Sequence, residues 1–354
     1  MSTWTKHQFG INATGNPVYA YTFTTETLEV VVLEYGLIVQ KLVVKSKRGQ
    51  QDIVLGYDTL SEYENDPYYI GAIIGRNANR IPGVLNIDDK VYNLKTNEGS
   101  NQLHGGQTGF DKRIWNCNIR QDELVCTLVS PDGDQGFPGE VTVEVRISVT
   151  IKQTDSVLDF QISASTTEAT LVNITRHDYF NLVDLAKASA LDHHVQINGD
   201  KRTLKNEENI TTGEVVPVEN TPYNFQEETS IEASIKAGST ELVKGFDNNY
   251  MLRDTGESLR ESAIVFDPVS RRQLKMYTTQ PAVQFYTGGH LGTFRGKQGI
   301  QYKPYSGLCL ETQHVPAAHL YPQFETTVLK PGQVYQHKIQ YHIGFRTEND
   351  QENT

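Results

Sequence analysis

The feature that most limits what this chain can fold into is a strict alternation of apolar and polar residues near its middle. Valine or isoleucine occupies every second position from Val141 to Val149, and polar or charged residues fill the positions between them. A period of two residues is typical of a strand that turns one face to a core and the other to water. We therefore predict a half-buried antiparallel strand over residues 140–150.

Further strands are predicted on both sides of this one. Residues 335–345 alternate in the same way near the C-terminus, and shorter runs rich in β-branched residues cover residues 28–34 and 53–55. Turn sequences rich in glycine, proline, asparagine and aspartate separate these runs at short intervals. The sequence predicts one short helix, around residues 231–237.

No linker, internal repeat or low-complexity segment divides the chain. Its 354 residues are 37% hydrophobic, which is enough for a large core. We predict an all-β fold, a single large antiparallel β-sandwich domain with few short helices, over residues 1–347. Residues 348–354 are predicted to form a polar tail.

Charge and composition exclude several classes of function. The net charge of −11 has no basic stripe within it, which argues against nucleic acid as a partner. No apolar stretch approaches the roughly 20 residues of a membrane helix, and the N-terminus lacks the basic start and apolar core of a signal peptide. Three cysteines without CxxC spacing fit reduced thiols. We expect a cytoplasmic protein, monomeric or homodimeric, with no membrane partner.

One carboxylate stands out at the end of the apolar run 307–310. Alternation places Glu311 on the same strand face as Cys309 and Gln313, where a charge is costly to bury unless a partner or a substrate satisfies it. Such a residue is a candidate catalytic base. The alternative is a core glutamate held by backbone donors or by an arginine, and both interpretations stay open on this observation alone.

Residues 171–182 form the second informative segment. Alternation places Asn173, Thr175, His177, Tyr179 and Asn181 on one face, which is polar and aromatic. Amides, hydroxyls and flat rings together are what a sugar-binding groove requires. His177 is thus a candidate site residue, although a purely structural histidine is the other interpretation.

Motifs for other chemistry are missing. The sequence has no GxxxxGK[ST] phosphate loop, no GxSxG serine nucleophile and no HExxH zinc motif. The adjacent residues His193 and His194 face opposite sides of a strand, and Pro316 breaks any helix that would join His314 to His319. We therefore predict neither a metal nor another cofactor.

Six segments in order resemble the aldose 1-epimerase (galactose mutarotase) family, over a region from about residue 52 to residue 345. They are Gly75–Arg80, Asn101–Gly106, Thr175–Leu182, Phe246–Tyr250, Gln280–Gly288 and Leu310–His314. The resemblance implies a single β-sandwich domain that interconverts the α and β anomers of free aldohexoses without a cofactor. One such segment would say little, whereas six in the same order are specific.

The resemblance also implies roles for individual residues. His177 matches the general acid of the family and Glu311 its general base. The predicted substrate-binding residues are Asn79, Arg80, His104, Asp178, Tyr179, Asp247 and Gln284. An acid and a base on opposite sides of the anomeric centre would suit ring opening.

The sequence departs from the family pattern at three places. Arg176 stands where asparagine is common, Ala317 replaces an aspartate, and Glu325-Thr326 replaces Pro-Ser. These changes spare the acid and the base, and they bear on the choice of sugar and on the rim of the groove.

Two other functions stay open. A hexose-6-phosphate 1-epimerase is the nearest, because Arg76, Arg80 and Arg176 could pair with a phosphate group. A non-catalytic sugar-binding module is the second, although it would need neither proton carrier.

Overall fold

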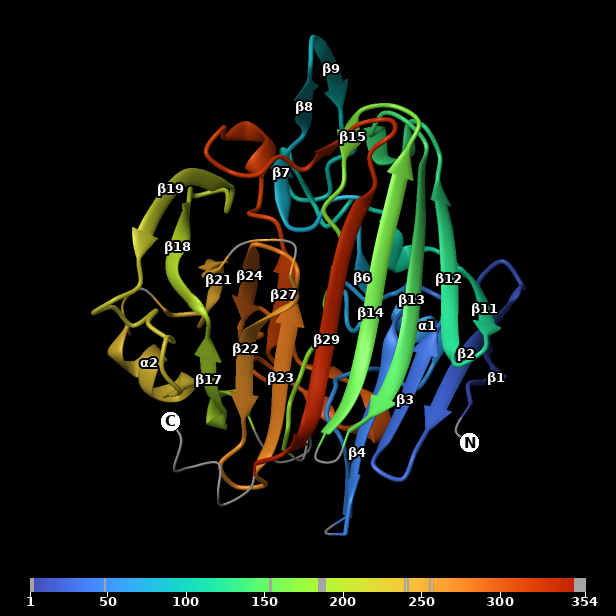
Figure 1. Cartoon of the computed structure of the whole chain (residues 1–354), viewed down its shortest axis with the longest axis vertical. Coiled ribbons are helices and arrows are strands. Elements are labelled where there is room, and N and C mark those ends of the chain that lie inside the picture. Colours follow the sequence, from blue (N-terminus) through green and yellow to red (C-terminus); the bar gives the residue numbers. More distant parts are fainter. Residues whose placement is uncertain are drawn as a thin grey trace.

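The computed structural model describes residues 3–47, 49–152, 155–183, 189–238, 240, 242–254, 256 and 258–346. Figure 1 shows a molecule built almost entirely of strands, with the long strands of the largest sheet crossing its middle. The two α-helices among the described residues are short, α1 over Leu60–Glu64 and α2 over Ile231–Ala237. The all-β prediction is therefore confirmed.

Three large sheets make up most of the fold. The nine-stranded sheet has the order β11 (Asn116–Arg120), β12 (Glu123–Ser130), β13 (Val141–Ile151), β14 (Asp155–Thr166), β29 (Tyr335–Phe345), β23 (Arg272–Thr278), β22 (Arg260–Phe266), β17 (His194–Ile197) and β20 (Thr229–Ser230). One five-stranded sheet comprises β1 (Thr5–Ile11), β2 (Pro17–Thr24), β3 (Leu28–Leu33), β4 (Val39–Ser46) and β5 (Gly49–Asp52). The other has the order β19 (Thr211–Pro217), β18 (Gly199–Lys205), β21 (Asp247–Leu252), β24 (Ala282–Tyr286) and β27 (Cys309–Gln313).

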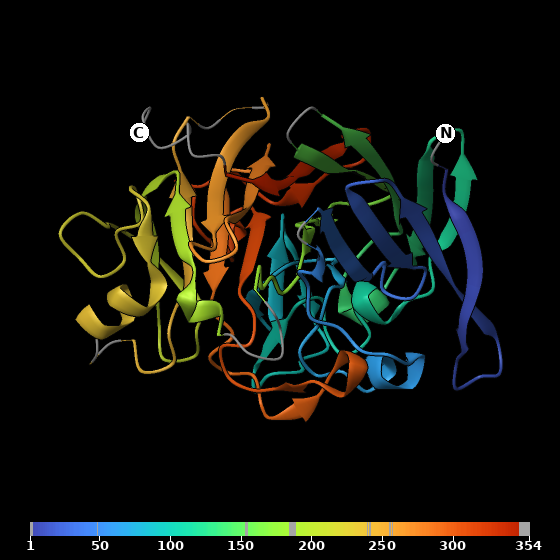
Figure 2. The same ribbon diagram turned by 90° about the horizontal axis from the view of Figure 1, so that it is seen from below.

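Short two-stranded pairs complete the fold. They are β10 (Asn101–Leu103) with β7 (Arg80–Pro82), β15 (Thr170–Leu171) with β28 (Val328–Leu329), β16 (Thr175–Arg176) with β6 (Ile73–Ile74), β25 (Phe294–Arg295) with β26 (Gln301–Tyr302), and β8 (Val84–Ile87) with β9 (Lys90–Asn93). The β8–β9 hairpin projects at the top of Figure 1, and in the view from below the orange segment that contains β25 and β26 runs along one edge of the molecule (Figure 2).

Strand β13 shows the alternating burial that the sequence predicts. Val141, Val143, Val145 and Ile147 are fully buried in β13, while the residues between them are exposed or half-buried. Their side chains belong to one core cluster that also takes residues from β3, β14 and β24. Burial of this apolar surface between sheets is the main stabilising term of such a fold.

Several other secondary-structure predictions can be compared with the structure. The strands near residues 28–34 and 335–345 and the helix at 231–237 are confirmed as β3, β29 and α2. Residues 53–55 are not a strand, because only Val54 forms an isolated bridge, with Phe180. The predicted tail 348–354 lies outside the described residues.

The prediction of three reduced thiols is wrong for two of the cysteines. Cys117 and Cys126 form a disulfide between β11 and β12, where they are directly opposite each other in the register. Their Cα atoms are 4.1 Å apart, so the two side chains meet across the antiparallel pair. Cys117 and Cys126 are nine residues apart in the sequence, a spacing that did not predict their pairing. Cys309 is a buried free thiol, as expected.

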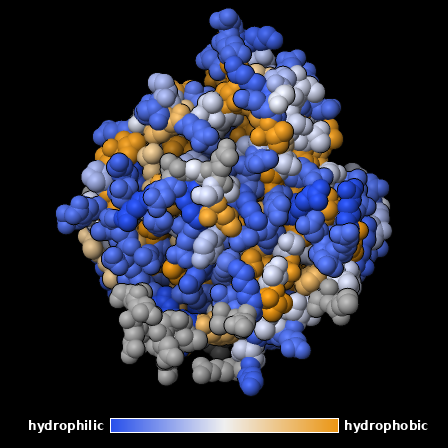
Figure 3. Space-filling view, viewed as in Figure 1, coloured by the Kyte–Doolittle hydropathy of each residue, from blue (hydrophilic) through white to orange (hydrophobic). Residues whose placement is uncertain are grey.

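The surface over the nine-stranded sheet is mainly hydrophilic. Figure 3 shows apolar residues there only in small separate groups. In the described part of the chain, no helix has the length and apolar character needed to cross a membrane.

Candidate active site

Glu311 lies at the centre of β27 and is 2% exposed. Its Oε1 atom is 3.7 Å from Nε2 of His177, and its Oε2 atom has no hydrogen-bond partner among the described residues. A core glutamate held by an arginine or by backbone donors would have both oxygens satisfied. The structure therefore favours the alternative in which a substrate donates the missing hydrogen bond to this carboxylate.

His177 directly follows β16 and is held by its backbone. Its N–H donates to the carbonyl of Ala72 at 2.9 Å, and its carbonyl accepts from the amide of Gly71 at 3.0 Å. The Nδ1 atom lies 3.5 Å from the sulfur of Cys309, which leaves Nε2 directed at Glu311. The ring is thus fixed with one nitrogen toward the carboxylate.

Burial changes the proton affinities of both groups. It lowers the pKa of His177 from 6.5 to about 4, because the charged imidazolium loses its hydration. Burial and the nearby carboxylate of Asp247 raise the pKa of Glu311 well above its ordinary value, an effect that Arg80 partly offsets. Burial therefore favours the neutral form of both groups, the imidazole of His177 and the carboxylic acid of Glu311.

His104 forms the third corner of the site, in the turn after β10. Its ring lies 5.2 Å from that of His177 and 4.7 Å from that of Tyr69. The backbone N–H of Asn79 donates to Nδ1 of His104 at 3.2 Å, and burial lowers the pKa of the ring well below 6.5. The neutral ring therefore carries its proton on Nε2, from which it can donate to a substrate hydroxyl.

Ligand atoms of His104, His177 and Glu311 lie within 4.8 Å of one another, a spacing that could hold a metal ion. The donor set fits a metal poorly, since a metal on Nε2 of His104 would require that proton to leave while Nδ1 still accepts from Asn79. No step below is routed through a metal.

Asp247 begins β21 and lines a polar cleft together with Gln284, the register partner of Glu311. Its Oδ1 atom accepts from the amide of Gln284 at 2.6 Å, and its Oδ2 atom accepts from Nζ of Lys205 at 3.1 Å. Burial alone would raise its pKa, but Lys205, Arg80 and Gln284 together hold it below the usual value. Asp247 is thus an ionised hydrogen-bond acceptor.

Sheet register brings these side chains into one row. Gln284 on β24 is the register partner of Glu311 on β27 and of Asn249 on β21. Side chains at paired positions point to the same face. Asp247 lies two residues before Asn249 on β21 and so points to the same face as Asn249. The predicted residues Glu311, Gln284 and Asp247 therefore share one face of the sheet.

Arg80 and Asn79 lie at the edge of this face. Two nitrogens of Arg80 bond the two carboxylate oxygens of Glu98, at 2.5 and 2.9 Å. The Oδ1 atom of Asn79 accepts the backbone N–H of Arg80 at 2.8 Å. The polar cleft over the sheet is lined by Asn79, Arg80, Thr203, Lys205, Asn209, Thr211, Asp247, Asn248, Asn249, Gln284 and Pro316.

Tyr179 packs beside His177, whereas Asp178 points away from it. The ring of Tyr179 packs 5.0 Å from that of His177, and its hydroxyl donates to the carbonyl of Tyr68. Asp178 is turned away from the site into the core, so its prediction as a sugar contact is wrong. Its carboxylate pairs with Arg176 at 2.7 Å and accepts from the hydroxyl of Tyr341 at 2.7 Å.

Arg176 is buried as well and does not reach the rim of the groove. Besides Asp178, it bonds the carbonyls of Leu37 and Gly71, and its guanidinium stacks over Phe160. Alternation along the segment explains this placement, because residues 176 and 178 face the side opposite to His177.

The sequence did not single out several residues around His177 and Glu311 as site residues. Tyr69 and Tyr286 place their rings 6.0 and 6.4 Å from that of His177, and Cys309 contacts its Nδ1 atom. Tyr286 and Cys309 could have been found, because each lies two residues from a predicted site residue on the same strand. No sequence pattern identifies Tyr69, which has a left-handed backbone with φ of 59°.

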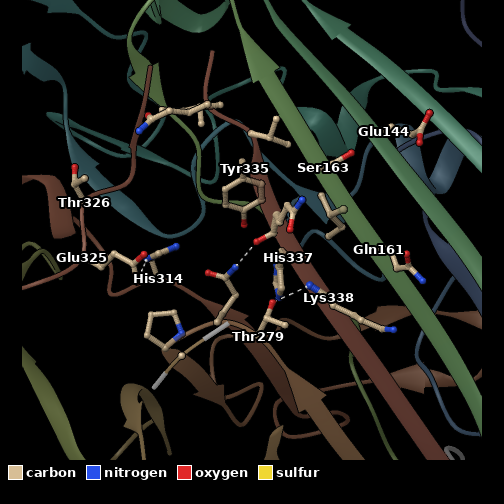
Figure 4. A pocket seen from close by; sticks show the side chains of 18 of the residues that line it. Glu144, Gln161, Ser163, Thr279, His314, Glu325, Thr326, Tyr335, His337 and Lys338 are labelled. Atoms are coloured by element: carbon tan, nitrogen blue, oxygen red, sulfur yellow. Dashed lines mark hydrogen bonds and ion pairs between the residues drawn. The ribbon is translucent and has the colours of Figure 1, made fainter. Parts of the chain in front are cut away.

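A larger groove of about 860 Å³ lies elsewhere, beside β29 and under the segment 314–334. Figure 4 shows Glu325 turned toward His314 and Thr279 bonded to the backbone of Lys338. Both nitrogens of His337 are engaged, with Thr278, Thr312 and the carbonyl of Ile174. The carboxylate beside the histidine of this groove belongs to Glu325, which is 72% exposed, whereas Glu311 is buried. The smaller cleft, whose lining residue Gln284 is the register partner of Glu311, is therefore the better candidate.

Comparisons with known proteins agree with this choice. A family model described as aldose 1-epimerase matches residues 19–342. The galactose mutarotase of Homo sapiens is 37% identical over 341 residues, which cover 95% of this chain and 97% of that protein. The aldose 1-epimerase of Escherichia coli K12 is 32% identical, covering 82% of this chain and 84% of that protein.

Solved structures show the same fold. A GalM/aldose epimerase homologue from C. elegans superposes with a TM-score of 0.84 at 25% identity, covering 98% of this chain and 100% of the other. Galactose 1-epimerase from Lactobacillus acidophilus gives a TM-score of 0.82 at 21% identity, with 98% and 100% coverage. The extent of the family match and the identity to the curated relatives lead to one conclusion: the chain belongs to the aldose 1-epimerase family of isomerases.

Proposed function

We propose that the chain interconverts the α and β anomers of free aldohexoses such as galactose and glucose, with His177 as general acid and Glu311 as general base. The observation that carries this assignment is the buried Oε2 atom of Glu311, which has no protein partner within the described residues and lies beside a neutral histidine. The relatives named galactose mutarotase support galactose as a substrate.

Ring opening needs two proton transfers. Glu311 in its ionised form removes the proton of the C1 hydroxyl, the electron pair forms the C1 carbonyl, and the bond from C1 to the ring oxygen breaks. The ring oxygen takes a proton from His177. Rotation about C1–C2 and the reverse transfers then close the ring as the other anomer.

The distance of 3.7 Å between the two groups differs from the expected arrangement on opposite sides of the anomeric centre. Both reacting oxygens are bonded to C1, so an acid and a base side by side can reach them from one face. After ring opening the proton rests on Glu311 and His177 is neutral, and burial favours the neutral form of each group. One shared proton thus serves both directions.

Arg76, Arg80 and Arg176, the arginines that could pair with a substrate phosphate, already bind protein groups. Arg80 is paired with Glu98 and Arg176 with Asp178, while Arg76 bonds the backbone carbonyls of residues 130, 131, 138 and 139. A phosphate group would have to displace one of these partners. These contacts favour a neutral sugar over a hexose 6-phosphate.

The activity is tested by polarimetry of freshly dissolved α-D-galactose and α-D-glucose. The protein should speed the approach to the final rotation for both sugars well beyond the rate in buffer. Glucose 6-phosphate is the comparison substrate and should relax more slowly. If only glucose 6-phosphate is turned over, the proposal fails. If galactose binds without any change in rate, the protein is a non-catalytic sugar-binding module.

The single domain over residues 1–347, the monomer or homodimer and the cytoplasmic location remain predictions of the sequence.

Asp247→Asn should weaken sugar binding more than it slows the reaction. The amide keeps the shape of the carboxylate but loses the charge that accepts from hydroxyl groups, and charge-assisted hydrogen bonds contribute about 1.5–3 kcal/mol. We expect KM for galactose to rise by roughly one to two orders of magnitude. Initial rates over a range of galactose concentrations give KM and kcat separately, and a fall in kcat at unchanged KM would contradict this role.

The dependence of kcat/KM on pH should form a broad bell. Below about pH 4, His177 gains a proton in addition to that of Glu311, so no base remains. At the alkaline limit Glu311 loses its proton while His177 is neutral, so no acid remains; because burial raises the pKa of Glu311, this limb should lie above the usual carboxyl range. The profile is measured with galactose, and an acid limb near pH 6.5 would show that His177 titrates as an exposed histidine.

A further inference from the structure

We propose that Lys205 is a substrate-binding residue of the cleft, donating to a sugar hydroxyl adjacent to the one that Asp247 accepts from. This inference rests on the proposed function, because it assigns a further contact to the same sugar.

Lys205 is the last residue of β18, which pairs with β21. Its ammonium donates to Oδ2 of Asp247 at 3.1 Å and to the carbonyl of the same residue at 3.0 Å. The side chain is 33% exposed and lines the cleft together with Arg80 and Gln284. Lys205 is therefore held at the sugar-binding carboxylate and still open to the cleft.

Within the described residues, the pair of Lys205 and Asp247 has hydrogen-bonding capacity left over. An ammonium has three donors, of which the contacts with Asp247 use two. The carboxylate can accept about four hydrogen bonds and accepts one each from Lys205 and Gln284. A free donor next to a free acceptor matches two neighbouring hydroxyls of a sugar.

A second polar atom in the cleft points to the same kind of ligand. Asn249 is buried, and its Oδ1 atom has no partner among the described residues, while its Nδ2 atom bonds Thr203. Asn249 lines the same cleft. A buried acceptor without a partner is costly unless a ligand donates to it. A polyhydroxylated ligand supplies such donors.

The charge of Lys205 does not make this an anion site, because Asp247 balances it. Nor does it make Lys205 part of the chemistry. The strand order β18, β21, β24, β27 separates it from Glu311 by three strand spacings of about 4.8 Å. Lys205 should therefore affect hydroxyls remote from C1, and hence binding rather than the chemical step.

The test compares Lys205→Met, Lys205→Arg and the control Lys201→Met in the full chain. Lys201 is an exposed residue of the same strand that does not line the cleft. For galactose, we expect Lys205→Met to raise KM about three- to tenfold, the range of one net hydrogen bond, with kcat changed less than about twofold. Lys205→Arg keeps a donor and should recover part of the loss, and Lys201→Met should resemble the wild type.

A panel of monodeoxygalactoses separates direct contact from an effect through Asp247. For the one sugar that lacks the hydroxyl bound by Lys205, wild type and Lys205→Met should have the same KM. An equal loss for every deoxy sugar would mean that Lys205 only orients Asp247, and an unchanged KM for galactose would mean that it does neither; either outcome overturns the proposal. An inactive wild type would instead refute the proposed function.

Discussion

Glu311→Gln is expected to slow mutarotation of galactose by a factor of about 10²–10⁴, the contribution of one positioned acid or base. Glutamine has the shape of the glutamate but cannot take the proton of the C1 hydroxyl. The site should still bind the sugar, because Asp247, Gln284 and His104 are unchanged. Polarimetry of fresh α-D-galactose measures the rate, with the spontaneous rate in buffer subtracted.

Glu325→Gln is the matched control for this experiment. Glu325 is 72% exposed and lies beside His314 in the larger groove next to β29, which we call the outer groove. The substitution Glu325→Gln therefore makes the same chemical change in the competing cavity. Its rate should equal that of the wild type. If Glu311→Gln relaxes the rotation as fast as the wild type, Glu311 is not the base; if Glu325→Gln is the slow variant, the reaction takes place in the outer groove.

Arg176→Met is expected to lower the free energy of unfolding by about 3–5 kcal/mol, the usual cost of leaving one member of a buried ion pair without its partner. The guanidinium is buried, and its removal would strand the Asp178 carboxylate beside Tyr341 with no cation. Unfolding in urea, followed by tryptophan fluorescence, gives the difference.

Two further variants make this result specific. Arg146→Met removes an exposed arginine whose pairs with Glu144 and Glu123 lie at the surface, and it should leave the free energy of unfolding nearly unchanged. The double variant Arg176→Met/Asp178→Leu removes both buried charges and should be more stable than Arg176→Met alone. A loss for Arg176→Met no larger than for Arg146→Met would show that the pair is not desolvated.

The strands that the sequence predicted well are those with one face in water. In β13 and β29 polar and apolar residues alternate because the environment alternates. Residues 171–182 lack this contrast, since both faces are buried. Thr175 bonds the carbonyl of Thr312, and the side chain of Asn173 bonds the backbone of His314, so the segment forms only the short strands β15 and β16.

The candidate site was predictable where a residue belongs to a recognisable segment, as His177, Asp247 and Glu311 do. Lys205 could not be found in this way, because its place at Asp247 depends on how β18 pairs with β21. Asp178 was misplaced for a related reason. It was assigned to the site because its neighbours His177 and Tyr179 are site residues, although alternation places it on the opposite face together with Arg176. Only its contact with Tyr341, 163 positions away, leaves no trace in the local sequence.

The ion pair on either side of His177 in the sequence also limits how this part of the chain can evolve. Replacing either Arg176 or Asp178 alone leaves a buried charge, whereas replacing both leaves none. A lineage that exchanges this pair for neutral residues must therefore change two codons nearly together or pass through a poorly folded intermediate. Among relatives, residues 176 and 178 should accordingly be inherited as a unit, while His177 between them stays the same.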